Sequence, residues 1–160
     1  MRSFISVILL SVFIFSCTKK DAIGYSDTII KPQLAIVAEM DTIFDGSETS
    51  METIRKNRKE MVTIAQNALQ EIQKLDDFKT NSSFKNSAVD YFSFVKNYYS
   101  ATENIDSIIY KFNSEERIQK LTENQYNETQ EKFEEYLALE QKLLSEQQRF
   151  AKEFNMPLKK

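Results

Sequence analysis

Apolar residues recur at intervals of three and four positions along most of the chain, the spacing that gathers them on one face of an α-helix. No segment shows the strict apolar–polar alternation of a β-strand. The pattern predicts an all-α fold, an antiparallel bundle of about four helices that occupies residues 26–156 and is followed by a tail at 157–160. The four predicted helices are about 28–44, 49–77, 82–112 and 114–154.

Residues that commonly cap helices mark the starts of three of these segments. Thr49 and Glu52 have the spacing of a capping box, in which each side chain bonds the backbone N–H of the other residue. Asn81–Ser82 and Asn113–Ser114 are candidate caps of the third and fourth segments. Because the fourth segment is much longer than the others, we expect it to overhang, bend or break near Asn124.

The first and third segments each have a feature that affects how they pack. In the first, Pro32 must lie in the first turn or kink the helix. The third segment is the most apolar, and its apolar residues fill an arc of about 200° on a helical wheel. A surface helix needs a narrower stripe, so this helix is predicted to touch two neighbours. The apolar face of the first segment is predicted to be Ile30, Leu34, Val37 and Phe44.

Two charged residues fall on predicted core faces. Asp106 lies within the apolar arc of the third segment, and Arg58 lies on the stripe of the second. If these segments form an antiparallel hairpin that turns near Thr80, Arg58 lies about one turn from Asp106. A carboxylate that faces a core is costly unless it is paired, and arginine can bind it through two hydrogen bonds. We therefore predict an Arg58–Asp106 pair; the alternatives are that the side chains lean out at the bundle edge, or that they form a charged recognition site.

The N-terminal segment has a different character from the rest of the chain. Arg2 is followed by a nearly unbroken apolar run from Phe4 to Phe15, and then by Ser16 and Cys17. The run is shorter than the ~20 residues of a transmembrane helix and has the layout of a signal peptide. The alternative, a buried N-terminal helix of the domain, should have a polar face, and none is present.

The sequence Ile14-Phe15-Ser16-Cys17 resembles the lipobox of bacterial lipoprotein precursors. The resemblance implies that lipid with acyl chains such as palmitate is attached to Cys17, and that a peptidase cuts between Ser16 and Cys17. Residues 1–16 would then be removed, and 17–25 would form a flexible, lipidated tether. Inner-membrane lipoproteins of the enterobacterial type often carry aspartate after the cysteine, so the resemblance implies that Thr18 favours the outer membrane over the inner one. The alternative is an ordinary cleaved signal peptide with a cysteine there by chance.

Composition argues against an enzyme. The chain has no histidine, its single cysteine is assigned to lipid, and its two glycines are isolated. The commonest general base, a thiol nucleophile and a phosphate-binding loop are therefore missing, and we expect no metal and no cofactor. A net charge of −3 gives no reason to expect a nucleic-acid partner.

Other side chains have both a structural and a functional interpretation. Tyr91, Tyr98 and Tyr99 are expected in the core, with a sugar or peptide platform as the alternative. The glutamates of the fourth segment are expected on a solvated face. Thr28, Thr42 and Ser107 each follow an aspartate and precede an apolar residue, which resembles the acceptor sequence of an O-glycosylation system for exported bacterial proteins.

Two functions remain from these observations. The first is a non-catalytic lipoprotein of the cell envelope, periplasmic or surface-facing, which binds another protein or has a structural role. In layout the chain resembles small, uncharacterised all-helical envelope lipoproteins. The second is a carrier that holds a lipid or other small apolar molecule between its helices. A core without a pocket of about 300 Å³ would favour the first function.

Overall fold

The computed structural model describes residues 2–44, 49–79, 81–101 and 104–157, with side chains from Lys19 onward. These residues form helices and no strand, which confirms the predicted all-α fold. The helices are α1 (Arg2–Ile43), α2 (Met51–Gln73), α3 (Ser83–Ala101), α4 (Ile105–Phe112), α5 (Glu115–Ile118) and α6 (Glu123–Glu153).

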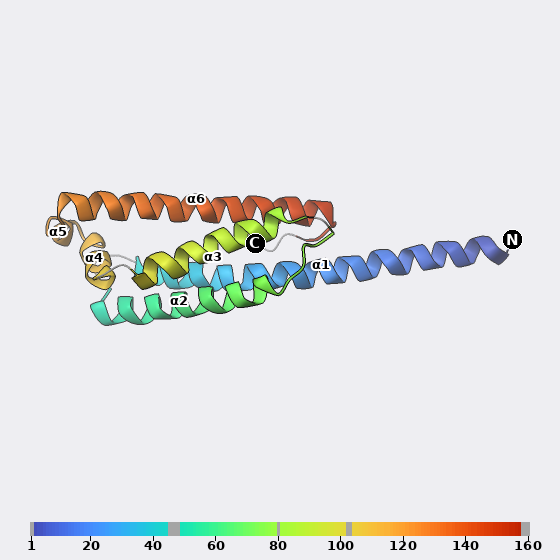
Figure 1. The fold of residues 1–160 in the computed structure, drawn as a ribbon, viewed down its shortest axis with the longest axis horizontal. Helices are drawn as coiled ribbons and strands as arrows, with labels where there is room; N and C mark the ends of the chain where they lie inside the picture. Colours follow the sequence, from blue (N-terminus) through green and yellow to red (C-terminus); the bar gives the residue numbers. More distant parts are fainter. Residues whose placement is uncertain (1, 45–48, 80, 102–103, 158–160) are drawn as a thin grey trace.

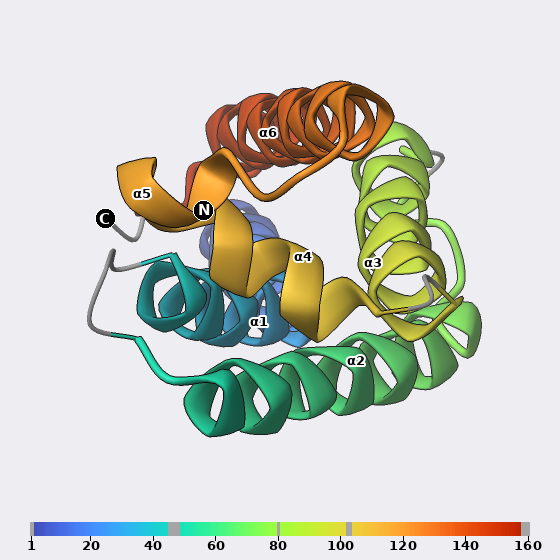
Figure 2. The ribbon, with the colours of Figure 1, turned by 90° about the vertical axis from the view of Figure 1, so that its left-hand side faces the viewer.

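Four long helices form the antiparallel bundle (Figure 1). Helix α2 packs against α1 and α3, and α3 packs against α6. Helices α4 and α5 lie across one end of the bundle, which we call the distal end (Figure 2). At the opposite end, which we call the proximal end, residues 74–79 and 154–157 lie where α2 leads into α3 and where α6 stops (Figure 1). The N-terminal part of α1 extends beyond the proximal end (Figure 1).

Helix α1 contradicts two expectations from the sequence. The residues predicted to be a flexible tether are helical, and Ala22 and Tyr25 within them are buried in the core. The bundle therefore begins before residue 26. Pro32 also lies inside the helix, so its expected place in the first turn is wrong; the proline has no N–H to donate to the carbonyl of Thr28.

The buried face of α1 differs from the predicted one. Leu34 is 48% exposed, whereas Gln33 is almost fully buried. The observed buried face includes two polar residues, Ser26 and Gln33, and these interrupt the apolar spacing of three and four in the sequence. Its buried members are Ala22, Tyr25, Ser26, Ile29, Ile30, Gln33, Ile36, Met40 and Ile43.

The predicted third helix is divided in two. Helix α3 ends at Ala101, and α4 begins after Asn104, which has a left-handed backbone with φ of 59°. Asparagine adopts this conformation more readily than most residues. The chain can therefore turn at Asn104 and lay α4 across the distal end, instead of extending α3 beyond it.

The predicted fourth helix is also divided, close to the expected break. Helix α5 ends at Ile118, and α6 begins at Glu123 with Thr122 as its N-cap. Thr122 and Gln125 form a capping box, because each side chain accepts a hydrogen bond from the other residue's backbone N–H. The box expected at Thr49 is wrong by one residue, since Ser50 caps α2 by accepting from the Thr53 N–H at 3.1 Å.

Candidate functional site

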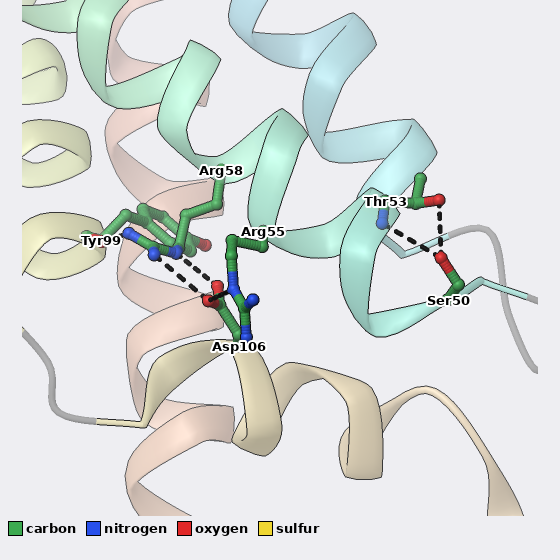
Figure 3. Close-up of polar contacts among 6 residues, drawn as sticks. All are labelled: Ser50, Thr53, Arg55, Arg58, Tyr99 and Asp106. Atoms are coloured by element: carbon green, nitrogen blue, oxygen red, sulfur yellow. Dashed lines mark hydrogen bonds and ion pairs between the residues drawn. The ribbon is translucent and has the colours of Figure 1, made fainter.

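A cluster of charged side chains joins α2 to α4 at the distal end (Figure 3). Arg58 donates from Nε to Oδ1 of Asp106 at 2.5 Å and from Nη2 to Oδ2 at 3.3 Å. It also donates from Nη1 to the Tyr99 carbonyl oxygen at 2.8 Å, at the end of α3. The Arg58 and Asp106 side chains are 15% and 14% exposed. The predicted pair is confirmed, and it ties three helices together.

A second arginine shares the same carboxylate. Arg55, one turn before Arg58, donates from Nε to Oδ2 of Asp106 at 3.3 Å and is 56% exposed (Figure 3). Burial alone would raise the pKa of Asp106, but the hydrogen bonds and charges of Arg58 and then Arg55 outweigh burial and lower it. Asp106 also lies in the first turn of α4, where the helix dipole favours a negative charge.

The first turns of α2 are basic on balance, with four basic residues against the exposed Glu52 and Glu60. Asp106 supplies one negative charge to two guanidinium groups, and Lys56 and Lys59 are exposed beside them. The side chains are suited to holding an anionic group by charge and hydrogen bonds. We call Arg55, Lys56, Arg58, Lys59 and Asp106 the distal charge cluster.

The tyrosines are mainly structural. Tyr91 and Tyr99 are buried, which confirms the core prediction for both, whereas Tyr98 is partly exposed. The hydroxyl groups of Tyr91 and Tyr136 lie 3.2 Å apart across α3 and α6. Burial is the main cause that raises the pKa of both hydroxyls, so they remain neutral.

The larger hollows are open grooves at the surface. One, of about 610 Å³, lies between α3 and α6 and is lined by residues that include Phe94, Tyr98 and Lys132. Another, of about 420 Å³, lies at the distal end beside Phe44 and Phe112. Two other hollows are more enclosed than these grooves. One lies between α1 and α6 and measures about 40 Å³, and the other lies around Tyr99 and measures about 10 Å³. Neither could hold a lipid or a similar ligand.

A polar contact within the bundle was not anticipated from the sequence. Gln33 of α1 donates from Nε2 to Oε1 of Glu140 in α6 at 3.1 Å. Burial raises the pKa of Glu140; the bond from Gln33 opposes the rise, and the charge of Asp41 adds to it. The spacing of Ile29, Ile36 and Met40 is the sequence signal that could have placed Gln33 on the buried face.

The modification sites predicted from the sequence are only partly described. The side chains of Ser16 and Cys17 lie outside the described residues, although their backbone belongs to α1. The hydroxyls of Thr28 and Thr42 donate to the carbonyl oxygens of Gly24 and Ala38, each at 3.0 Å.

The third predicted acceptor, Ser107, is partly exposed in the first turn of α4. It lies far along the chain from the other two, and the three hydroxyls come from two helices, α1 and α4. They are therefore three separate positions and not one site.

Two further features concern the part of the chain whose side chains are described. No group of three or more histidine, cysteine, aspartate or glutamate residues among them is arranged to hold a metal ion. In the same part of the chain, no helix is both long enough and apolar enough to cross a membrane.

Comparisons with known proteins add no functional information. No protein-family model, no curated protein and no solved structure matches the chain.

Proposed function

We propose that this chain is the precursor of a non-catalytic lipoprotein of the bacterial cell envelope. In the mature protein, lipid on Cys17 anchors the bundle to a membrane, with the outer membrane favoured by Thr18. The bundle contacts another envelope or surface protein or has a structural role. The observation that carries the proposal is the position of the chain's single cysteine, directly after an apolar run of signal-peptide length.

The filled core supports an interaction role over a carrier role. A carrier needs an enclosed space for its ligand, and the two enclosed cavities described above measure only about 40 and 10 Å³. At the distal end, the exposed Arg55, Lys56 and Lys59 of the distal charge cluster offer an attachment point for an acidic partner.

Crosslinking in native membranes followed by purification of the lipidated protein tests this role. We expect a protein to co-purify with the wild type and to be reduced at least severalfold with a Lys56→Glu, Lys59→Glu variant. Lys31→Glu, Lys142→Glu makes the same change in charge at exposed positions of α1 and α6, away from both ends of the bundle, and is the matched control. A co-eluting lipid with no protein partner would overturn the interaction role.

A further inference from the structure

The proximal end of the bundle is held close to the position of the anchor. Helix α1 is uninterrupted from Cys17 to Ala22, and the Ala22 side chain is fully buried. Five residues of α-helix rise about 7.5 Å. A lipid on Cys17 therefore lies less than two turns from the core, with no flexible tether between them.

The surface of the proximal end contains aromatic and other apolar side chains. The Phe78 ring lies 5.2 Å from Tyr25, 5.4 Å from Phe150 and 5.0 Å from Phe154, centroid to centroid. Tyr25 and Phe150 are buried, so this aromatic cluster closes the core. Phe78 and Phe154 remain partly exposed, as does Met156, and Pro157 is exposed.

Lysines surround this apolar surface. Lys79 lies at the turn before α3 with φ of 48°, and its Nζ lies 5.8 Å from the centroid of the Phe154 ring. Within residues 19–21, 74–79 and 152–157, five exposed lysines accompany four exposed carboxylates. Apolar rings with lysines around them fit the boundary of a bilayer, where the rings enter the interface and the ammonium groups reach lipid phosphates.

The long faces of the bundle are less suited to an anionic membrane. Helix α6 carries eight glutamates and four basic residues. The large apolar side chains that are well exposed among the described residues are Leu34, Tyr126 and Leu137, and all lie on α1 or α6. Helix α2 is basic near its start, but it exposes no large apolar side chain that could enter the interface.

We propose that the proximal end rests on the headgroup layer of the membrane that holds the lipid. The Phe78 and Met156 side chains enter the interface, the Lys79 ammonium group contacts anionic headgroups, and the bundle stands end-on. This inference rests on the proposed lipid anchor at Cys17. It places the distal charge cluster tens of ångströms from the membrane, where a protein partner can reach it.

Thiol labels at different heights test this orientation. Lipid on the single native cysteine leaves an introduced cysteine as the only free thiol. Lys79→Cys reports on the proximal end, Lys59→Cys on the α2 face and Gln141→Cys on the α6 face; all three residues are exposed. Along the helices, positions 59 and 141 each lie about 20 Å from the proximal end. Lys74→Cys is a second proximal position that leaves the Lys79–Phe154 contact intact.

The probe is a fluorophore on each cysteine of the full-length, natively processed protein. The protein is reconstituted in phosphatidylethanolamine–phosphatidylglycerol vesicles that contain headgroup-nitroxide lipid. We expect quenching at positions 74 and 79 to be at least threefold stronger than at 59 and 141. Replacing phosphatidylglycerol with phosphatidylcholine should weaken the proximal quenching.

Each other result overturns the inference in a distinct way. Quenching at 59 equal to that at 79 means that the bundle lies on α2, and equal quenching at 141 means that it lies on α6. Uniformly weak quenching of a lipidated protein means that the bundle is held away from the membrane. In these cases the proposed anchor still stands. A wild-type chain that acquires no lipid overturns the anchor and the orientation together.

Discussion

Gln33 and Glu140 form a single hydrogen bond inside the bundle, although a glutamine amide and a carboxyl group can form two. Gln33 Nε2 donates to Glu140 Oε1 at 3.1 Å, but the buried Gln33 Oε1 accepts no hydrogen bond. A protonated Glu140 carboxyl would supply the missing donor. Protonation of Glu140 would therefore give the Gln33 oxygen a donor, and it would also remove the buried charge that raises the pKa of Glu140.

This contact leads to a pH-dependent prediction. Because the pKa of Glu140 is raised in the folded state, its stabilising contribution is complete below the unfolded pKa and is lost as the pH rises through the folded pKa. Glu140→Gln keeps an acceptor for Gln33 Nε2 and adds an N–H donor at every pH. We expect this variant to be more stable than the wild type by about 1 kcal/mol at pH 7, with the difference vanishing near pH 4.

Urea unfolding at pH 4, 5.5 and 7 measures the effect. Glu131→Gln, on the exposed face of the same helix, is the control and should change stability by less than about 0.5 kcal/mol. If Glu140→Gln is the less stable protein at pH 7, the ionised carboxylate is a favourable part of the fold and this explanation is wrong.

We expect the two arginine contacts of Asp106 to contribute very differently to the free energy of unfolding. Asp106→Ala leaves the mostly buried Arg58 guanidinium without its carboxylate, which should cost about 2 kcal/mol of unfolding free energy. Arg55→Ala removes a largely exposed contact to the same carboxylate and should cost less than about 0.5 kcal/mol. Thermal and urea unfolding of both variants provide the comparison, and equal effects would contradict it.

Acid should weaken the same pair. The pKa of Asp106 is lowered in the folded state, so its contribution is present above the unfolded pKa, near 4, and is lost as the pH falls through the folded pKa. We expect the stability difference between the wild type and Asp106→Asn to shrink steadily as the pH is lowered from 5 to 2. A difference that stays constant over this range would mean that the charge of Asp106 does not stabilise the fold.

The capping box at Thr122 determines where α6 begins. Thr122→Ala removes the acceptor for the Gln125 N–H and should destabilise the protein by about 1 kcal/mol, whereas Thr122→Ser keeps that acceptor and should restore most of the loss. Thr63→Ala is a matched control, because the Thr63 hydroxyl lies exposed within α2 and bonds only the Lys59 carbonyl. Chemical denaturation should separate Thr122→Ala from both other variants.

The proposed anchor predicts a change in membrane partitioning. Cys17→Ala should leave the precursor unprocessed or release the protein from membranes, because acyl chains contribute about 0.8 kcal/mol per buried CH₂. Detergent-phase separation and the mass of the purified protein report on both outcomes. Equal partitioning of variant and wild type, with no mass of lipid on the wild type, would contradict the anchor.

The Arg58–Asp106 contact could be predicted from the sequence, but the helix from which Asp106 makes it could not. The expected antiparallel pairing gives the correct register between α2 and the residues after α3, although Thr80, the expected turn, lies outside the described residues. The contact was predicted on one continuous third helix, but Asp106 reaches Arg58 from α4, after the turn at Asn104. A single helical wheel cannot reveal such a turn, because the apolar period continues on both sides of it.

Helix α1 shows why other positions were missed. Its period is hidden by Ser26 and Gln33, polar residues that are buried, and by Leu34, an apolar residue that is exposed. Periodicity assumes that polarity and burial agree, and here they disagree at three positions. The extension of the helix before residue 28, through Gly24, was missed for a related reason, since the packing of Tyr25 and Ala22 overrides the weak local preference for helix.

The unbroken path of α1 also determines how the bundle bears mechanical load. Because α1 lies along the bundle axis and packs beside α2, a pull on its N-terminal end acts parallel to their shared interface (Figure 1). Buried side chains from Ala22 to Ile43 then resist sliding together, instead of separating one after another as they would if the helix were peeled away sideways. A pull on the N-terminal end is thus resisted by the whole buried face of α1 at once.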